Sequence, residues 1–315
     1  MSLIEQAAKR LEQLRQAGVE LPEQAPVEQV STSTSPYDKE LPVTAISEKA
    51  KSTSLPEKPT VFPSSIQTTL DLDAIAASGL LVPNAARSQL ADEFRVIKRP
   101  LIANAMGKGI EPISNGNLIM VTSALPGEGK SFTAINLAIS IAMELDNTVM
   151  LVDADVARPS VLNMLGLPPA EGLLDVLQQN SVDISGVLLR TNIEKLSILP
   201  SGTPHPRATE LLASDTMVRL LDDMASRYND RIIVFDSPPL LLTTESRVLA
   251  THMGQVVIVV NAENTAQAAV KQAITTIESC PQKMMVLNQV RQAKVDGYGY
   301  GYGYGYGYGY GNDNT

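Results

Sequence analysis

The sequence predicts an α/β fold, a three-layer α/β/α sandwich built around a mainly parallel sheet. Two observations predict it: short apolar runs alternate along the chain with helical stretches, and most of these runs are continuously apolar. Continuous apolar character indicates strands that helices cover on both faces. In such a sheet, ligands bind beyond the carboxyl ends of the strands.

The predicted elements follow one another in regular order. The strands are expected at 118–122, 148–152, 196–199, 232–235, 256–260 and 284–287. The helices between them are expected at 131–145, 159–166, 207–226, 245–253 and 265–279. One more helix, at 88–100, precedes the first strand, and we expect it to end at Pro100 because proline cannot continue the backbone hydrogen bonding.

The 315-residue chain divides into four predicted parts. Residues 1–20 carry apolar side chains at helical spacing and indicate a short amphipathic helix, which either docks on another surface or stays a frayed, solvated helix. Residues 21–80, rich in Pro, Ser, Thr and Glu, indicate a disordered linker. Residues 81–296 form the α/β domain, and 297–315 are a tail of alternating Gly and Tyr.

Composition excludes several classes of protein. The 25 Lys and Arg against 34 Asp and Glu give a net charge of −9, which argues against broad electrostatic binding to nucleic acid or anionic lipid. A single cysteine, Cys280, cannot form an internal disulfide, and two separated histidines cannot build a zinc site without carboxylates. Because no apolar run reaches the ~18–20 residues of a membrane span, we expect a cytoplasmic protein.

Residues 124–131, Ala-Leu-Pro-Gly-Glu-Gly-Lys-Ser, lie between a predicted strand and a predicted helix and form a phosphate-binding loop, or P-loop. Gly127 and Gly129 let backbone N–H groups approach phosphate oxygens, Lys130 reaches the β- and γ-phosphates, and Ser131 binds Mg²⁺. The alternative is an ordinary glycine-rich turn. The residues expected to contact ATP in this loop are Pro126, Gly127, Glu128, Gly129, Lys130, Ser131 and Phe132.

Three carboxylates follow predicted strands. Asp153 and Asp155 come at the end of the second strand and point the same way if strand geometry continues past it, and Asp236 follows the fourth strand. Each alone could be a helix cap or a turn former. Together with the P-loop they indicate one Mg·ATP site.

These segments resemble the bacterial tyrosine kinases, a P-loop NTPase-type family. The matching segments are 124–131 for the Walker A motif, 151–158 for Walker A′, 232–239 for Walker B, and 199–204 leading to Glu210-Leu211-Leu212. The resemblance covers about residues 85–310 and looks closest to the tyrosine autokinases of exopolysaccharide loci associated with exosortase systems.

The resemblance implies a role for each site residue. Lys130, Asp153 and Asp155 would be catalytic, with Asp153 contacting the hydroxyl of the incoming tyrosine or, alternatively, serving as a metal ligand. Ser131, Asp155 and Asp236 would hold Mg²⁺. Asn288 would read the adenine edge, and the alternative is a turn-forming Asn. The expected autophosphorylation sites are Tyr298, Tyr300, Tyr302, Tyr304, Tyr306, Tyr308 and Tyr310.

Two departures from the family pattern concern charged residues. The family arginine position of the Asp-x-Asp-x-Arg motif holds Ala157, and Arg158 follows one residue later. The oligomerisation helix pattern is represented by Asp92, Arg95 and Lys98, three charges at helical spacing that either join subunits or form a solvated face. The family has an arginine where this chain has Lys98, and lysine cannot form the bidentate ion pairs that arginine forms. We therefore expect any ring of subunits to be weaker in this protein.

The sequence therefore predicts an ATP-dependent protein-tyrosine autokinase that regulates exopolysaccharide polymerisation or export, with its tail phosphorylated in trans. The resemblance implies a homo-oligomer, an inner-membrane chain-length protein that recruits and activates the kinase, and a protein-tyrosine phosphatase. Two alternatives stay open: a switching ATPase scaffold of the septum-placement and partition type, and a non-enzymatic Gly-Tyr adhesive. Against the first, Leu125 stands where those ATPases carry a second lysine.

Overall fold

The structure is a computed structural model that describes residues 66–83, 88–178, 184–227 and 231–291. The predicted helix at 1–20, most of the predicted linker at 21–80 and the tail at 297–315 lie outside the described residues. All of the described residues belong to one compact unit of the chain.

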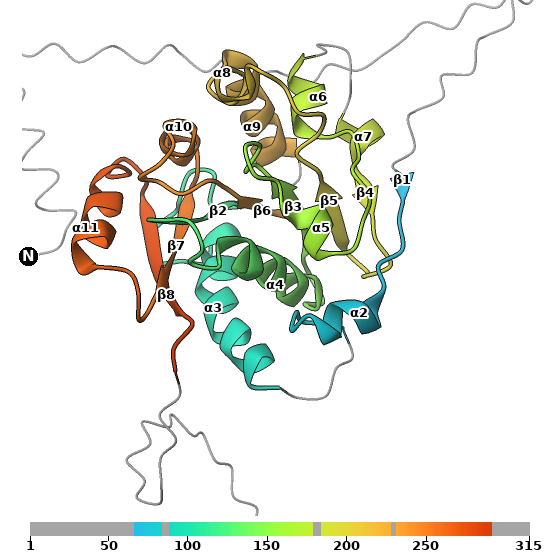
Figure 1. Ribbon diagram of the computed structural model, residues 1–315, viewed down its shortest axis with the longest axis horizontal. Helices are drawn as coiled ribbons and strands as arrows, with labels where there is room; N and C mark the ends of the chain where they lie inside the picture. Colours follow the sequence, from blue (N-terminus) through green and yellow to red (C-terminus); the bar gives the residue numbers. More distant parts are fainter. Residues whose placement is uncertain (1–65, 84–87, 179–183, 228–230, 292–315) are drawn as a thin grey trace, which may run out of the picture. The chain divides into compact units, whose positions relative to one another are not determined.

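The described residues form an eight-stranded sheet in the order β1-β4-β5-β3-β6-β2-β7-β8 (Figure 1). The strands are β1 Ile66–Gln67, β2 Leu118–Ser123, β3 Thr148–Asp153, β4 Leu189–Arg190, β5 Leu196–Leu199, β6 Arg231–Asp236, β7 Gln255–Asn261 and β8 Gln282–Asn288. Neighbouring strands run parallel except β4 and β5, which are antiparallel. The prediction of a mainly parallel sheet is confirmed.

Helices connect these strands and pack on the sheet. They are α2 Leu72–Ala77, α3 Gln89–Ala105, α4 Lys130–Ala142, α5 Val161–Met164, α6 Leu173–Gln178, α7 Ile184–Val187, α8 Ala208–Leu212, α9 Asp215–Arg227, α10 Glu245–Thr251 and α11 Gln267–Thr275. The single helix expected at 207–226 is two helices, α8 and α9, separated by a short break at residues 213 and 214.

The core has two halves, one on each face of the sheet. Along β2, Leu118 and Met120 pack with residues of α6, α8, α9, α10 and α11, whereas Ile119 and Val121 pack with α2, α3 and α4. Alternate residues of a strand point to opposite faces, so one strand contributes to both halves. The predicted three-layer sandwich is confirmed, and it places the carboxyl ends of β2, β3, β6 and β7 at one edge.

The folded domain begins earlier than the sequence predicts. Residues 66–80, assigned to the disordered linker, include β1 and α2, and both Leu70 and Ile75 are 2% exposed. Asp71 caps α2, because its side chain accepts hydrogen bonds from Asp73 N and Ala74 N. These elements are too short to give a hydrophobic period, so long-range packing defines them, and the linker prediction is wrong for this stretch.

The prediction that helix 88–100 ends at Pro100 is also wrong, because α3 continues to Ala105 with Pro100 inside it. Leu101 is fully buried, and its carbonyl accepts a hydrogen bond from Gln255 Nε2 of β7 at 3.0 Å. Asn104 donates to Gln255 Oε1 at 3.0 Å. This anchoring of the last turns outweighs the ~3 kcal/mol cost of an internal proline.

Candidate active site

The P-loop lies between the end of β2 and the start of α4. Its backbone requires glycine at two places, since Gly127 has φ 81° and Gly129 has φ 93°. A Cβ atom at Gly129 would also lie 2.1 Å from Asn288 Nδ2. The predicted strand-loop-helix context is therefore present, and the loop leads into the positive N-terminus of a 13-residue helix.

Lys130 is the point where the three predicted motifs meet. Its Nζ lies 2.6 Å from Asp155 Oδ2 and 3.8 Å from Asp236 Oδ1. The same atom lies 3.3 Å from Ser131 Oγ. A cation surrounded by acidic groups at the mouth of a P-loop is poised to exchange these partners for phosphate oxygens.

Asp155 reaches Lys130 by a route that differs from the prediction. β3 ends at Asp153, so strand geometry does not extend to Asp155. A turn carries it instead, in which Asp155 Oδ1 accepts from Arg158 N at 3.2 Å. Arg158 is exposed at the same cavity as Asp155, whereas the neighbouring Ala157 offers no charge.

A cavity of about 370 Å³ opens beside Lys130. It is enclosed by the P-loop, the turn after β3 and the loop after β6. The lining residues are Pro126, Gly127, Lys130, Asp155, Ala157, Arg158, Ser160, Pro238, Pro239, Leu242 and Thr243. Its size and its mixed apolar and charged walls suit an aromatic side chain that carries a hydroxyl group.

Asp153 and Asp236 are paired at the ends of β3 and β6, and neither of them lines this cavity. Asp153 Oδ2 accepts hydrogen bonds from Ser160 N and Val161 N, each at 3.1 Å. Burial, and the negative charge of Asp236, raise the pKa of Asp153 to about 7. A carboxylate with this raised pKa accepts a proton more readily than one of ordinary pKa.

Asp236 is fully buried, and burial raises its pKa to about 6 although Lys130 acts in the opposite direction. Among the described residues, neither Oδ atom of Asp236 has a hydrogen-bond partner, and Asp153 Oδ1 has none. Buried carboxylate oxygens without donors are costly. These carboxylate oxygens are suited to a cation that binds together with the nucleotide.

The donor set fits Mg²⁺ bound together with phosphates. Within the described ranges, no group of three His, Cys, Asp or Glu side chains could hold a metal ion by itself. Mg²⁺ usually takes only one or two carboxylates and completes its shell with water and substrate phosphates. Ser131, Asp155 and Asp236 meet that requirement, and Ser131 Oγ accepts a 2.8 Å hydrogen bond from Ser160 Oγ. Ser160 was not predicted from the sequence.

Glu128 was expected to contact nucleotide, but its side chain points into the protein. It is 3% exposed, and its Oε2 accepts from Leu125 N at 2.6 Å. Its Oε1 accepts from Thr265 Oγ1, in the loop after β7. Only the backbone of Glu128 remains for phosphate. Thr265 was missed because nothing local in the sequence relates it to the P-loop.

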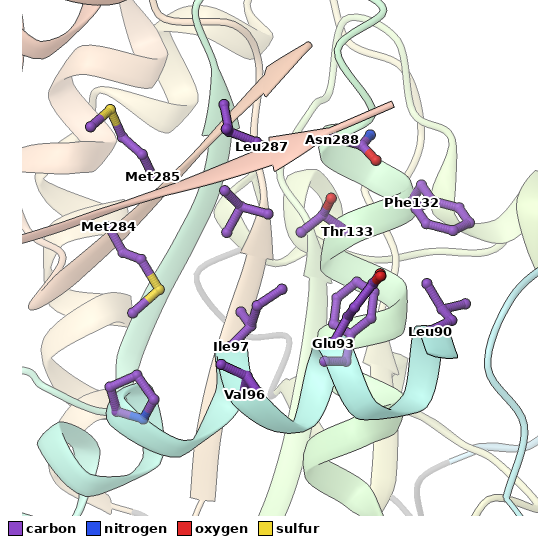
Figure 2. A pocket seen from close by; sticks show the side chains of 13 residues that line it. Leu90, Glu93, Val96, Ile97, Phe132, Thr133, Met284, Met285, Leu287 and Asn288 are labelled. Atoms are coloured by element: carbon purple, nitrogen blue, oxygen red, sulfur yellow. The ribbon is translucent and has the colours of Figure 1, made fainter. Parts of the chain in front are cut away.

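Asn288 is the last residue of β8, and its Nδ2 donates to the backbone carbonyl of Glu128 at 2.9 Å. Figure 2 shows Asn288, Phe132 and Thr133 bordering a pocket of about 560 Å³ between α3 and β8. The structure thus brings Asn288, predicted to read the adenine edge, and Phe132, predicted to contact ATP, to one pocket next to the P-loop. The left-handed backbone of the turn after β8 falls on Gln289, whose φ is 57°, rather than on Asn288.

The three charges predicted to join subunits do not share one exposed face. Lys98 is 5% exposed, lies 2.7 Å from Glu144 Oε1 and donates to the Ser140 carbonyl of α4. Because it is used inside the chain, its assignment to an intersubunit surface is wrong. Arg95 pairs with Asp92 one turn away on the exposed side of α3. For these two residues the prediction stands untested.

Comparisons with known proteins identify the family. A family model described as an AAA domain matches residues 116–290, more than half of the chain. The chain is 33% identical over 182 residues to the tyrosine-protein kinase YwqD of Bacillus subtilis (strain 168), which covers 57% of this chain and 75% of YwqD. The chain belongs to the bacterial tyrosine kinase family.

Other members of the family agree. The tyrosine-protein kinase CpsD of Streptococcus agalactiae is 30% identical over 195 residues, or 60% of this chain and 83% of CpsD. The crystal structure of the chimerical protein CapA2B2 superimposes with a TM-score of 0.56 at 28% identity, covering 71% of this chain and 92% of that one. Longer relatives match over about a fifth of their own length.

The chain is therefore a protein-tyrosine kinase with a P-loop ATP site. Of the three functions weighed from the sequence, the relatives support this one. The described residues include no helix that is long and apolar enough to cross a membrane.

Proposed function

We propose that this bacterial tyrosine kinase transfers the γ-phosphoryl group of Mg·ATP to the seven tyrosines of its own C-terminal tract, Tyr298 to Tyr310. One observation carries the proposal. The 2.6 Å Lys130–Asp155 pair lines a cavity of about 370 Å³ that can admit a tyrosine. Two buried acids contact the residues that line it: Asp236 lies 3.8 Å from Lys130 Nζ, and Asp153 accepts a hydrogen bond from Ser160 N. The same chain supplies the substrate.

ATP would bind with its phosphates against the backbone N–H groups of Gly127, Gly129 and Ser131 at the N-terminus of α4. Lys130 would then turn from Asp155 to the β- and γ-phosphate oxygens. Ser131, Asp155 and Asp236 would hold Mg²⁺, which neutralises charge that develops on the transferred phosphoryl group. This assignment is supported by the Asp236 oxygens, which have no hydrogen-bond partner among the described residues and only a 3.8 Å ion pair with Lys130.

Asp153 would orient the tyrosine hydroxyl and accept its proton. The phenolic oxygen forms a bond to the γ-phosphorus while the bond from that phosphorus to the β,γ-bridging oxygen breaks, and ADP leaves. With a pKa of about 7, Asp153 accepts a proton more readily than a carboxylate of ordinary pKa. The alternative role as a metal ligand remains, because Asp153 Oδ1 also lacks a hydrogen-bond partner among the described residues.

We further propose that transfer occurs in trans and disperses the assembly. Residues 291–296 connect the domain to the tract, and six extended residues span roughly 20 Å. Reaching the chain's own cavity would require a tight reversal, whereas a neighbouring subunit presents its cavity without that constraint. Seven phosphotyrosines would add roughly −10 to −14 charges and oppose further docking on an acidic site.

The cellular role we propose is control of exopolysaccharide polymerisation or export, in the manner of exosortase-associated autokinases. An inner-membrane chain-length protein would recruit and activate the kinase, and a tyrosine phosphatase would reset it. The name of the chimera CapA2B2 pairs CapB with a second protein, CapA, which supports an activator of that kind. Deleting residues 1–20 should release the kinase from membranes and leave ATP binding intact. Unaltered fractionation would reject this segment as the anchor.

Two proteins, mixed with Mg·ATP, test the proposal. The first is full-length Lys130→Met, which has an intact tail but no lysine for the phosphates, and the second is a wild-type domain truncated after Asp296. Mass spectrometry should find phosphate on the Lys130→Met tail. Lys271→Met, which changes an exposed lysine of α11, should label itself like wild type.

Two results would contradict the proposal. If Lys130→Met labels its own tail without a partner, the P-loop is not the kinase site. If its tail stays unlabelled beside the truncated kinase, while wild type labels itself at a rate independent of concentration, transfer occurs in cis and the release cycle is wrong.

A further inference from the structure

A buried carboxylate inside the P-loop is unexpected, because the loop must bind the most negative part of ATP. Glu128 is 3% exposed, and in the described part of the chain no Lys or Arg forms an ion pair with it. A negative charge in low dielectric repels phosphates nearby and is costly to bury. The hydrogen bonds that the Glu128 carboxylate makes must therefore offset the cost of burying it.

We propose that Glu128 and Thr265 are positioning residues of the nucleotide site, which hold the P-loop in its phosphate-binding shape. The inference rests on the proposed function only in taking a phosphate-bearing nucleotide as the ligand. The carboxylate joins two loops: Oε2 accepts from Leu125 N at 2.6 Å, and Oε1 accepts from Thr265 Oγ1. Asn261 N lies 3.5 Å from Oε1 as a weaker third donor.

The bond to Leu125 decides where the loop's N–H groups point. By accepting this N–H within the protein, Glu128 closes the first turn of the loop from inside. The N–H groups at the apex and at the start of α4 are then left to face the ligand, as a site for phosphate requires. A hydrogen bond to a charged acceptor is about twice as strong as a neutral one, which suits a loop that must keep its shape without ligand.

The second attachment comes from a preformed turn after β7. Asn261 Oδ1 accepts from Glu263 N at 3.1 Å and from Asn264 N at 3.0 Å. Thr265 N donates to the Asn261 carbonyl at 3.1 Å. This turn fixes the Thr265 hydroxyl opposite the P-loop, and the Glu128 carbonyl is held from the other side by Asn288. Residue 128 is thus fixed through both its side chain and its backbone.

Calorimetric titrations with ADP and with adenosine separate a role in positioning the P-loop from a role in the stability of the whole domain, because only ADP has phosphates. Glu128→Ala should weaken ADP binding by about tenfold, because the phosphate-facing N–H groups lose their alignment, and should change adenosine binding by less than about twofold. Glu128→Gln keeps an acceptor for Leu125 and a donor for Thr265, so it should recover ADP affinity to within about threefold of wild type. Thr265→Val, which removes only the hydroxyl, should weaken ADP binding by about fivefold.

The double variant Glu128→Ala/Thr265→Val should bind ADP as tightly as Glu128→Ala alone, because Glu128→Ala already breaks the hydrogen bond that Thr265→Val removes. Exposed counterparts, Glu278→Ala and Thr275→Val, should bind both ligands like wild type. The proposal is overturned if Glu128→Ala binds ADP within twofold of wild type, or loses ADP and adenosine equally. If Glu128→Ala does not fold, unchanged ADP affinity in Thr265→Val overturns it. Since ADP binding needs no phosphoryl transfer, this outcome is independent of the kinase assay.

Discussion

Asp153→Asn should stabilise the nucleotide-free kinase while it removes activity. Burial and the charge of Asp236 raise the pKa of Asp153 from 3.8 to about 7, so between these values the folded protein binds a proton that the unfolded chain does not. The free energy of unfolding therefore falls as the pH rises through this window. The full effect is at most about 4 kcal/mol, of which about 3 kcal/mol falls between pH 5 and pH 8.

An asparagine escapes this cost. Its carbonyl oxygen can accept from Ser160 N and Val161 N as Asp153 Oδ2 does, and its amide can face Asp236, an acceptor without a hydrogen-bond partner among the described residues. Asp153→Asn should therefore be more stable than wild type by up to about 4 kcal/mol at pH 8, and by about 1 kcal/mol at pH 5. Kinase activity should fall by about 10² to 10⁴, the usual share of a group that moves a proton.

Urea denaturation at pH 5 and pH 8 without nucleotide measures the difference. Asp222→Asn, which removes the same charge from the exposed face of α9, should keep the pH dependence of wild type. The reasoning is refuted if Asp153→Asn loses as much stability between pH 5 and pH 8 as wild type does. Loss of activity without the stability gain would leave Asp153 catalytic but would refute its raised pKa.

Three further changes test other contacts. Lys98→Ala should lower the free energy of unfolding by about 1–3 kcal/mol in urea denaturation, because Lys98 binds Glu144 and the Ser140 carbonyl; the exposed Lys271→Ala should not. Asn288→Ala should reduce the preference for ATP over GTP in competition binding, and an unchanged preference would mean that Asn288 only supports the P-loop. Arg95→Glu should leave a monomer in sedimentation, and a size distribution equal to that of wild type would make Asp92 and Arg95 a solvated pair.

The sequence alone determined most of the strands, the P-loop and the edge of the sheet where the Asp residues lie, because each of these depends on residues close together in the chain. Continuous apolar runs indicated the strands from β2 to β7 apart from β4, because helices cover both faces of these strands. The apolar run of β8 indicated a strand too, although Met285 and Leu287 are exposed. Gly127, Gly129 and Lys130 were predictable because the backbone angles and the charge that a phosphate needs occur within one short loop. The Asp residues were placed at the correct edge for the same reason: parallel strands end together.

Tertiary structure decided what depends on residues far apart in the chain. The proline in α3 is tolerated because Gln255, more than 150 positions away, anchors the last turns, and Lys98 is internal because α4 lies beside it. The pKa of Asp153 depends on Asp236 and on burial by the surrounding chain, neither of which its own sequence neighbourhood shows. Glu128 points to Thr265 rather than to nucleotide for the same physical reason: hydrogen bonds and dielectric act through space, whereas sequence patterns record only neighbours along the chain.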